Sequence, residues 1–277
     1  MKSAKQPSSR IRLLAIDLDD TLLTEDLKIS PANSQAIRAA EAIGVQVVLA
    51  SGRAPQAMHP FIQELGLDKT EGYMIAFNGS TIIRTDTGVE EWGIKLDVDL
   101  LAEVWDLAEK RGRPLQTYLK DEIIYNEENE FTELDHKLTG IPIRKVSRAE
   151  FLAEPRVMLN SGGDPELLIP LEAEFNQVFG GRANMFRSKP FFFEIMHIHA
   201  DKGFALERLA AMHRIDRSAV MAIGDAMNDA GMLRWAGWPV AMANAVPAIQ
   251  NLAAWVTTKS HGDDGVAEAI DRFILHA

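Results

Sequence analysis

Three carboxylates stand close together near the start of the chain, in the stretch "LLAIDLDDTLL" (13–23). Asp17, Asp19 and Asp20 directly follow an apolar run, and each of them disfavours the ionised form of its neighbours. A bound cation would relieve this repulsion. Carboxylates in such a cluster can act as a nucleophile, as a general acid or base, or as ligands of Mg²⁺.

Three later stretches supply groups that could hold a phosphate. "SGR" contributes the hydroxyl of Ser51 and backbone N–H groups that can donate to an anion. "DKG" places Lys202, a compact positive charge, in the first turn of a predicted helix. "GDAMNDAGML" adds three more polar side chains, Asp225, Asn228 and Asp229.

Taken together, these side chains predict phosphoryl transfer. Asp17, Asp19 and Asp225 would form an oxygen-rich site suited to Mg²⁺, which usually takes one or two carboxylates with water and substrate phosphate. Asp17, at the tip of a predicted strand, is placed to attack phosphorus and form an aspartyl-phosphate. Asp19 would protonate the leaving oxygen and then deprotonate the attacking water.

The elements that must position these residues alternate between strand and helix. Residues 11–17 are predicted to form a buried strand of a parallel sheet. Ser30 caps the helix that follows, and Gly44 stands just past its end. The pattern then repeats with a strand at 45–50, a helix at 55–65 and a strand at 73–77.

The same pattern returns after Lys202, where a predicted helix leads into a strand at 219–224 and then into further helices, one of them at "VPAIQNLAA" and the last ending at His276. This alternation predicts an α/β fold with a doubly wound, Rossmann-like parallel sheet covered by helices on both faces. Ligands of such sheets bind outside the carboxyl ends of the strands. Asp17, Ser51 and Asp225 are therefore expected to meet at that edge.

The middle of the chain has a different, α+β texture. Helical segments are predicted at 98–110 and 165–179, among short strands such as "EIIYN" and "PFFFEIM". We therefore expect an inserted module. Residues 1–10 are predicted to be a disordered tail. Residues 11–84 and 197–277 would form a two-part catalytic core, and residues 85–196 an inserted α+β cap domain that sets substrate choice.

The motifs "DLDDTLL", "SGR", "DKG" and "GDAMNDAGML", in that order, resemble the four signature motifs of the haloacid dehalogenase (HAD) superfamily. The closer resemblance is to its Cof-type phosphatases (subclass IIB), which carry a large α/β cap between the second and third motifs. "FNGS" (77–80), "FFFEIM" (191–196) and residues 242–270 are also similar to this group. Asp20 departs from the pattern, because the superfamily often has glycine there.

The resemblance implies a role for each matching residue. Asp17 would be nucleophile and metal ligand, and Asp19 the acid and base, with its carbonyl on the metal. Asp225 would bind Mg²⁺, and Asp229 would support the metal or Lys202. The groups implied to lie on or near the substrate phosphate are Ser51, Gly52, Lys202 and Asn228.

The amino-acid composition limits the classes of molecule that the protein can be expected to bind. The 277 residues are 47% hydrophobic and 25% charged, with a formal net charge of −11, which argues against nucleic-acid or anionic-membrane partners. There are no cysteines, so disulfides and thiolate ligands are excluded. No apolar run has the roughly 20 residues of a membrane span, and the polar start does not resemble a signal peptide. A small phosphorylated metabolite as substrate and a cytoplasmic location are the expectations.

Several interpretations remain open at this point. Phosphosugar mutases share the four motifs but return the phosphoryl group to the substrate, and receiver-type regulatory modules share the acidic cluster but carry no large insertion. His197 and His199 lie on one side of a predicted strand and could be metal ligands, although no third imidazole is near them. Arg53 and Glu194 could face the substrate or form surface salt bridges.

Overall fold

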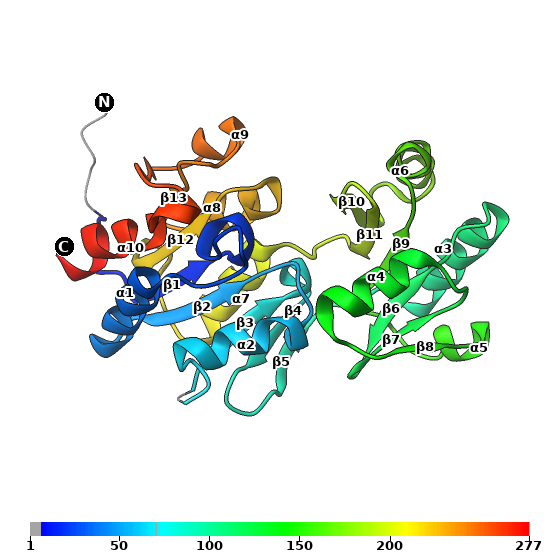
Figure 1. Ribbon diagram of the computed structural model, residues 1–277, viewed down its shortest axis with the longest axis horizontal. Coiled ribbons are helices and arrows are strands. Elements are labelled where there is room, and N and C mark those ends of the chain that lie inside the picture. Colours follow the sequence, from blue (N-terminus) through cyan, green and yellow to red (C-terminus); the bar gives the residue numbers. More distant parts are fainter. Residues whose placement is uncertain (1–6, 70, 277) are drawn as a thin grey trace. The chain divides into compact units, whose positions relative to one another are not determined.

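The computed structural model describes residues 7–69 and 71–276. These residues form two compact units (Figure 1). The core unit combines the part of the chain up to Trp92 with the part from Asp201 onward, and the inserted unit is the continuous segment Gly93–Ala200. The core unit extends to Trp92, beyond the predicted limit at residue 84, because a hairpin after residue 80 adds two strands to its sheet.

The core unit is built on a sheet in which eight described strands run in the order β14-β13-β12-β1-β2-β3-β4-β5. Its central strand, β1 (Leu13–Ile16), is fully buried and parallel to both neighbours, so that Ala15 lies opposite Ala222 on one side and Val48 on the other. The predicted α/β class with a parallel-sheet core is confirmed. The other strands are β2 (Gln46–Ala50), β3 (Tyr73–Ala76), β4 (Thr81–Arg84), β5 (Glu90–Gly93), β12 (Val220–Gly224), β13 (Trp238–Ala241) and β14 (Trp255–Val256).

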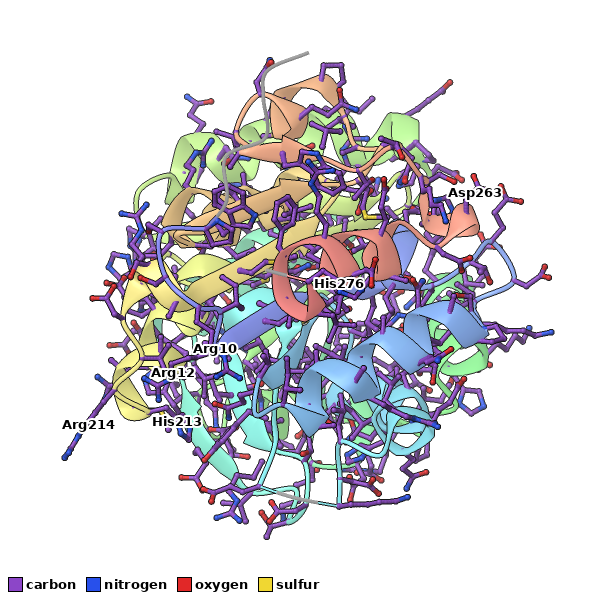
Figure 2. The ribbon with its side chains drawn as sticks, turned by 90° about the vertical axis from the view of Figure 1, so that its left-hand side faces the viewer. Arg10, Arg12, His213, Arg214, Asp263 and His276 are labelled. Carbon is purple, nitrogen blue, oxygen red and sulfur yellow. The ribbon has the colours of Figure 1, made fainter. Side chains whose placement is uncertain are left out.

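Helices cover both faces of this sheet, as predicted. α1 packs beside α2 and α10, and α7 packs beside α8 on the other face (Figure 2). The Ser30 hydroxyl accepts a hydrogen bond from the Asn33 N–H and so caps α1, and Gly66 ends α2 with a positive φ of 77°. The helices are α1 (Pro31–Ala42), α2 (Pro55–Leu65), α7 (Lys202–Met212), α8 (Ala230–Trp235), α9 (Pro247–Gln250) and α10 (Gly265–Ile270).

Short helical turns connect these elements. A kinked turn, Leu18–Leu22, follows β1, and a π-helical turn, Asp271–Leu275, follows α10. The 3-10 turns are Phe77–Gly79, Arg217–Ala219, Met227–Asp229 and His261–Asp263.

The inserted unit has a sheet of its own, with six described strands in the order β10-β11-β9-β6-β7-β8. α3 and α6 cover one face of this sheet, where Trp105 of α3 and Phe175 of α6 belong to the same buried apolar cluster as Phe193 of β11. The strands are β6 (Gln116–Leu119), β7 (Glu122–Tyr125), β8 (Ile143–Lys145), β9 (Met158–Gly162), β10 (Ala183–Lys189) and β11 (Phe192–His197). The helices are α3 (Val98–Lys110), α4 (Glu130–Thr139), α5 (Arg148–Phe151) and α6 (Pro165–Phe179), of which α3 and α6 coincide with the predicted helices.

Two segments differ from the sequence prediction. The helix expected around "VPAIQNLAA" is limited to α9, because the Ala254 N–H donates to the Pro239 carbonyl and the chain joins the sheet as β14, a strand that was not predicted. Of the predicted disordered tail, residues 1–6 lie outside the described residues. Ser9 and Arg10 form hydrogen bonds with Ser218 and Ile43 of the core unit.

The basic residues before β1 and after α7 gather on one side of the core unit. Figure 2 shows Arg12, His213 and Arg214 close together, and it shows Asp263, in the turn whose His261 lies beside Asp20 past the carboxyl end of β1, well away from them. This group therefore contributes no positive charge to the carboxyl ends of the strands.

No helix among the described residues is long and apolar enough to cross a membrane.

Candidate active site

The candidate site lies at the carboxyl ends of three neighbouring parallel strands. Asp17 follows β1, Ser51 follows β2 and Asp225 follows β12 (Figure 1). The Asp17 N–H donates to the Ile223 carbonyl at 3.1 Å, and the Ser51 N–H donates to the Ile75 carbonyl at 2.9 Å. These bonds continue the sheet ladder one residue past each strand, so the backbone of both residues is held rigidly.

A buried lysine joins two of the carboxylates. Lys202 is fully buried in the first turn of α7, and its Nζ donates to Asp17 Oδ1 at 2.5 Å and to Asp229 Oδ1 at 2.7 Å. Burial by itself lowers the pKa of Lys202, but the two carboxylates together outweigh it and hold the pKa above the usual lysine value. Lys202 is therefore a permanent positive charge beside Asp17.

Asp17, Asp225 and Asp229 form a cluster of buried carboxylates whose oxygens lie within 4.8 Å of one another. The pKa of Asp17 is raised well above its usual value, first by burial and then by the Asp229 charge. The same two causes raise the pKa of Asp225 to about 7. One lysine balances only part of this charge, and hard carboxylate oxygens are the ligands that Mg²⁺ prefers, so these residues fit a bound Mg²⁺.

Asp229 orders the loop around this cluster. Its Oδ2 accepts the N–H groups of Asp225 at 2.9 Å and of Ala226 at 3.0 Å, while its Oδ1 accepts Lys202. Asp225 in turn accepts the Thr21 hydroxyl at 2.9 Å, which ties the loop after β12 to the turn after β1. Of the two roles implied for Asp229, these contacts favour the support of Lys202.

Asp19 stands apart from the three buried carboxylates. The turn Leu18–Leu22 directs its side chain to Arg53, which forms a two-point ion pair with it at 2.9 Å (Nε to Oδ2) and 2.6 Å (Nη2 to Oδ1). The hydrogen bond to Asp19 raises the pKa of Arg53. Sequence analysis left Arg53 open between a substrate contact and a salt bridge, and the structure shows the salt bridge, with a candidate catalytic residue as its partner.

The residues implied on the phosphate lie around a second turn. Ser51 is buried, and its hydroxyl accepts the Arg53 N–H at 3.2 Å. A Cβ at Gly52 would lie 2.9 Å from the side-chain nitrogen of Asn78, so any larger residue there would force the Asn78 amide to shift. Asn228 donates to Asn78 Oδ1 at 3.2 Å.

Asn78 was not among the predicted site residues, although it lies in the "FNGS" stretch. It has a φ of 51°, and its N–H donates to the Ser51 carbonyl at 2.9 Å, so it supports the turn that carries Ser51. An asparagine beside a glycine directly after a buried strand is the signal that could have identified it, because asparagine tolerates the left-handed conformation.

Glu194, His197 and His199 belong to the inserted unit. The rings of His197 and His199 lie 5.5 Å apart, and the His199 N–H donates to His197 Nδ1 at 3.1 Å. Burial and then the nearby His199 lower the pKa of His197. Over residues 7–69 and 71–276, Asp17, Asp225 and Asp229 form the only group of three or more carboxylates, histidines or cysteines close enough to share a metal, so the pair lacks a third ligand.

Comparison with known proteins agrees with this geometry. The family model of haloacid dehalogenase-like hydrolases matches residues 14–270. The Bacillus subtilis (strain 168) protein YxeH, to which a phosphatase activity is provisionally ascribed, is 34% identical over 95% of this chain and 98% of its own. The 5-amino-6-(5-phospho-D-ribitylamino)uracil phosphatase YcsE of the same organism is 30% identical over 99% of this chain and 100% of its own.

A solved structure shares the fold over nearly the whole chain. It is a haloacid dehalogenase-like hydrolase from Bacteroides thetaiotaomicron, with a TM-score of 0.86, 30% identity and coverage of 95% of this chain and 99% of its own. The match therefore includes the inserted unit as well as the core unit. With the family model, these relatives and the order of the four motifs in agreement, the chain belongs to the haloacid dehalogenase-like hydrolases.

Proposed function

We propose that the protein is a Mg²⁺-dependent phosphatase that hydrolyses small phosphomonoesters through an aspartyl-phosphate on Asp17. The main support is the place of Asp17, whose carboxylate stands at the end of the central strand, buried beside Lys202 and two further carboxylates. The phosphatase activities named for its relatives support the same reaction class.

We assign three groups to Mg²⁺, namely the carboxylates of Asp17 and Asp225 and the backbone carbonyl of Asp19. Asp229 supports them. When bound, the cation supplies positive charge that offsets the repulsion between these carboxylates and an incoming phosphate.

Asp17 is the nucleophile in this scheme. Lys202 donates to its Oδ1 and so holds the carboxylate in one orientation. An Asp17 oxygen bonds to phosphorus as the ester P–O bond breaks, and the leaving oxygen takes a proton from Asp19. Asp19 then removes a proton from a water molecule, which attacks phosphorus and releases inorganic phosphate and free Asp17.

The ion pair between Asp19 and Arg53 affects the protonation of the leaving oxygen. Asp19 can donate a proton only when protonated, whereas the two-point contact with Arg53 favours the ionised carboxylate. The contact therefore has to loosen before the leaving oxygen is protonated, and it can re-form once Asp19 has given up its proton.

Four groups are proposed to hold the phosphate oxygens: Ser51, the N–H of Gly52, Lys202 and Asn228.

The inserted unit is proposed to act as the cap that selects the leaving group. YcsE, a relative of the whole protein, is named for a phosphorylated ribityl compound. The first substrates to test are therefore small phosphate esters of hydroxylated carbon chains, including sugar phosphates. The receiver-type alternative predicts no large insertion, whereas Gly93–Ala200 forms one. A phosphosugar mutase remains the second candidate because it uses the same motifs.

The test is to measure free phosphate released from a panel of phosphorylated metabolites, with Mg²⁺ and with excess chelator. We expect release that needs Mg²⁺ and that Asp225→Ala abolishes at low Mg²⁺, while the variant keeps its circular-dichroism spectrum. Full activity in excess chelator would contradict the metal assignment. Conversion of a sugar phosphate to its isomer without free phosphate would identify a mutase.

A further inference from the structure

The turn that carries Asp19 contains a strained residue. Asp20 has φ 58° and ψ 12°, in the left-handed region, although it is not glycine. A residue with a Cβ adopts this conformation at a cost, because the Cβ crowds the backbone. Something must therefore hold Asp20 in place for the turn Leu18–Leu22 to keep its shape.

Asn244, in the segment after β13, makes the contact that can do this. Its Nδ2 donates to the Asp20 backbone carbonyl at 2.8 Å. Its Oδ1 accepts the backbone N–H of His261 at 3.0 Å. Since an N–H only donates, this second bond fixes the amide with its NH₂ group toward Asp20.

The same segment also contacts the loop that carries Asp225. The Val246 N–H donates to the Asp225 carbonyl at 3.1 Å, and Asp225 accepts the Thr21 hydroxyl. The segment 242–246 therefore touches both of the turns that carry candidate catalytic and metal-binding groups. Nothing in the sequence motifs assigns it a role.

We propose that Asn244 is a positioning residue for catalysis. Its hydrogen bond keeps Asp20 in the left-handed conformation and so keeps the turn that carries Asp19 in its working shape. This inference rests on the proposed function, because Asp19 is a catalytic group only in that reaction. Asn244 is exposed, so its truncation to alanine leaves no cavity and should not unfold the protein.

The first measurement is the steady-state kinetics of Asn244→Ala. Loss of one hydrogen bond shifts an equilibrium by about three- to tenfold, so kcat should fall by about that factor with KM within about twofold. Gln250→Ala is the matched control. Gln250 donates to the Ala243 carbonyl at 3.1 Å and so holds the same segment without touching Asp20, and its loss should leave kcat unchanged.

The decisive measurement is a rescue. Glycine adopts φ 58° without strain, so Asn244→Ala should lower kcat by less than about twofold in an Asp20→Gly background. In an Asp20→Ala background the Cβ remains, and the full loss should persist. A purely structural role of Asn244 would give the same loss in both backgrounds.

Wild-type kcat in Asn244→Ala, an equal loss in Gln250→Ala, or a loss that glycine at position 20 does not reduce would each overturn the inference. Failure of the proposed function is recognised separately, by turnover that persists in Asp17→Asn whatever happens at position 244.

Discussion

The two units place their buried polar side chains differently. In the core unit, Asp17 and Asp225 each stand one residue past the end of a parallel strand. In the inserted unit, a row of three buried polar side chains lies inside the strands. Glu194 of β11 pairs with Asn160 of β9, which pairs with Gln116 of β6, and these three side chains form one row across the sheet.

The partners of the two groups differ as well. The core carboxylates are held by a lysine and by backbone N–H groups. The row instead contacts α4 through Gln116, which accepts the Thr132 hydroxyl and donates to Asp135. Tyr118 also donates to Asp135. Under the proposed function, the core unit would bind the charged group common to all phosphate esters. The inserted unit, whose buried row and its partners combine amides and hydroxyls with the carboxylates of Glu194 and Asp135, would select the leaving group. The following predictions test that division.

The largest effect is expected at the nucleophile. Asp17→Asn keeps the shape of the side chain, but an amide is too poor a nucleophile to form an acyl-phosphate, so kcat should fall by about 10⁴-fold or more with every substrate. Mass spectrometry of trapped enzyme should place the phosphoryl group on Asp17. A phosphoryl group on Asp19, Asp20 or Asp225 would refute the assignment, and peptide mapping checks that the asparagine has not deamidated.

Asp19→Asn should lower kcat by about 10² to 10⁴, the usual range for a lost general acid and base. The loss should be smaller for p-nitrophenyl phosphate than for a sugar phosphate, because p-nitrophenolate leaves without protonation. The ratio of kcat values for the two esters is the measurement. An identical loss for both would mean that Asp19 does not protonate the leaving group.

Exchange of the inserted unit should change the substrate ranking. A chimera that carries the corresponding segment of YxeH in place of Gly93–Ala200 should alter the relative kcat/KM of different esters by about tenfold or more, since differences of a few polar contacts have this size. Asp17→Asn in the chimera should still abolish turnover. An unchanged ranking in a folded chimera would show that the core unit also selects the leaving group.

The smallest effect concerns the stability of the inserted unit. Burial raises the pKa of Asp135, against the hydrogen bonds from Tyr118 and Gln116. Because the folded state binds this proton more tightly than the unfolded state, the stabilisation is complete below a pH of about 4 and is lost as pH rises through the folded pKa.

Thermal unfolding of the full chain between pH 4.5 and 8 should therefore show a decline that Asp135→Asn removes. Asp164→Asn, at an exposed position before α6, is the control that should leave the decline in place. A decline of equal size in Asp135→Asn and in the wild type would assign it to other groups.

The position of Asp17, Ser51 and Asp225 at one edge of the sheet was predictable from the sequence, whereas their catalytic and binding roles stay predictions. The carboxyl ends of parallel strands share one edge, so Asp17, Ser51 and Asp225 had to meet once their strands were recognised. The contact between Arg53 and Asp19 was not predictable, because it depends on the rotamers of two turn residues.

The polar row of the inserted unit escaped prediction for another reason. The alignment of Gln116, Asn160 and Glu194 follows from the register between strands far apart in the chain, and no local pattern encodes that register. The short strand β14 was missed for a different reason, because two residues carry too little periodicity to be recognised.

The split of the core unit around the inserted unit has a consequence for the order of events during synthesis. The Thr21–Asp225 hydrogen bond joins residues 204 positions apart, and β1 pairs with β12, where Leu13 lies opposite Val220, across a similarly long stretch of chain. Since folding proceeds from the N-terminus as the chain emerges, β1 and β2 must wait for their third partner while the inserted unit, a continuous segment, can fold first. Until Lys202 and the loop after β12 have left the ribosome, Asp17 has neither its counter-charge nor the carboxylates of Asp225 and Asp229 beside it, so the reaction proposed above could not begin on a nascent chain.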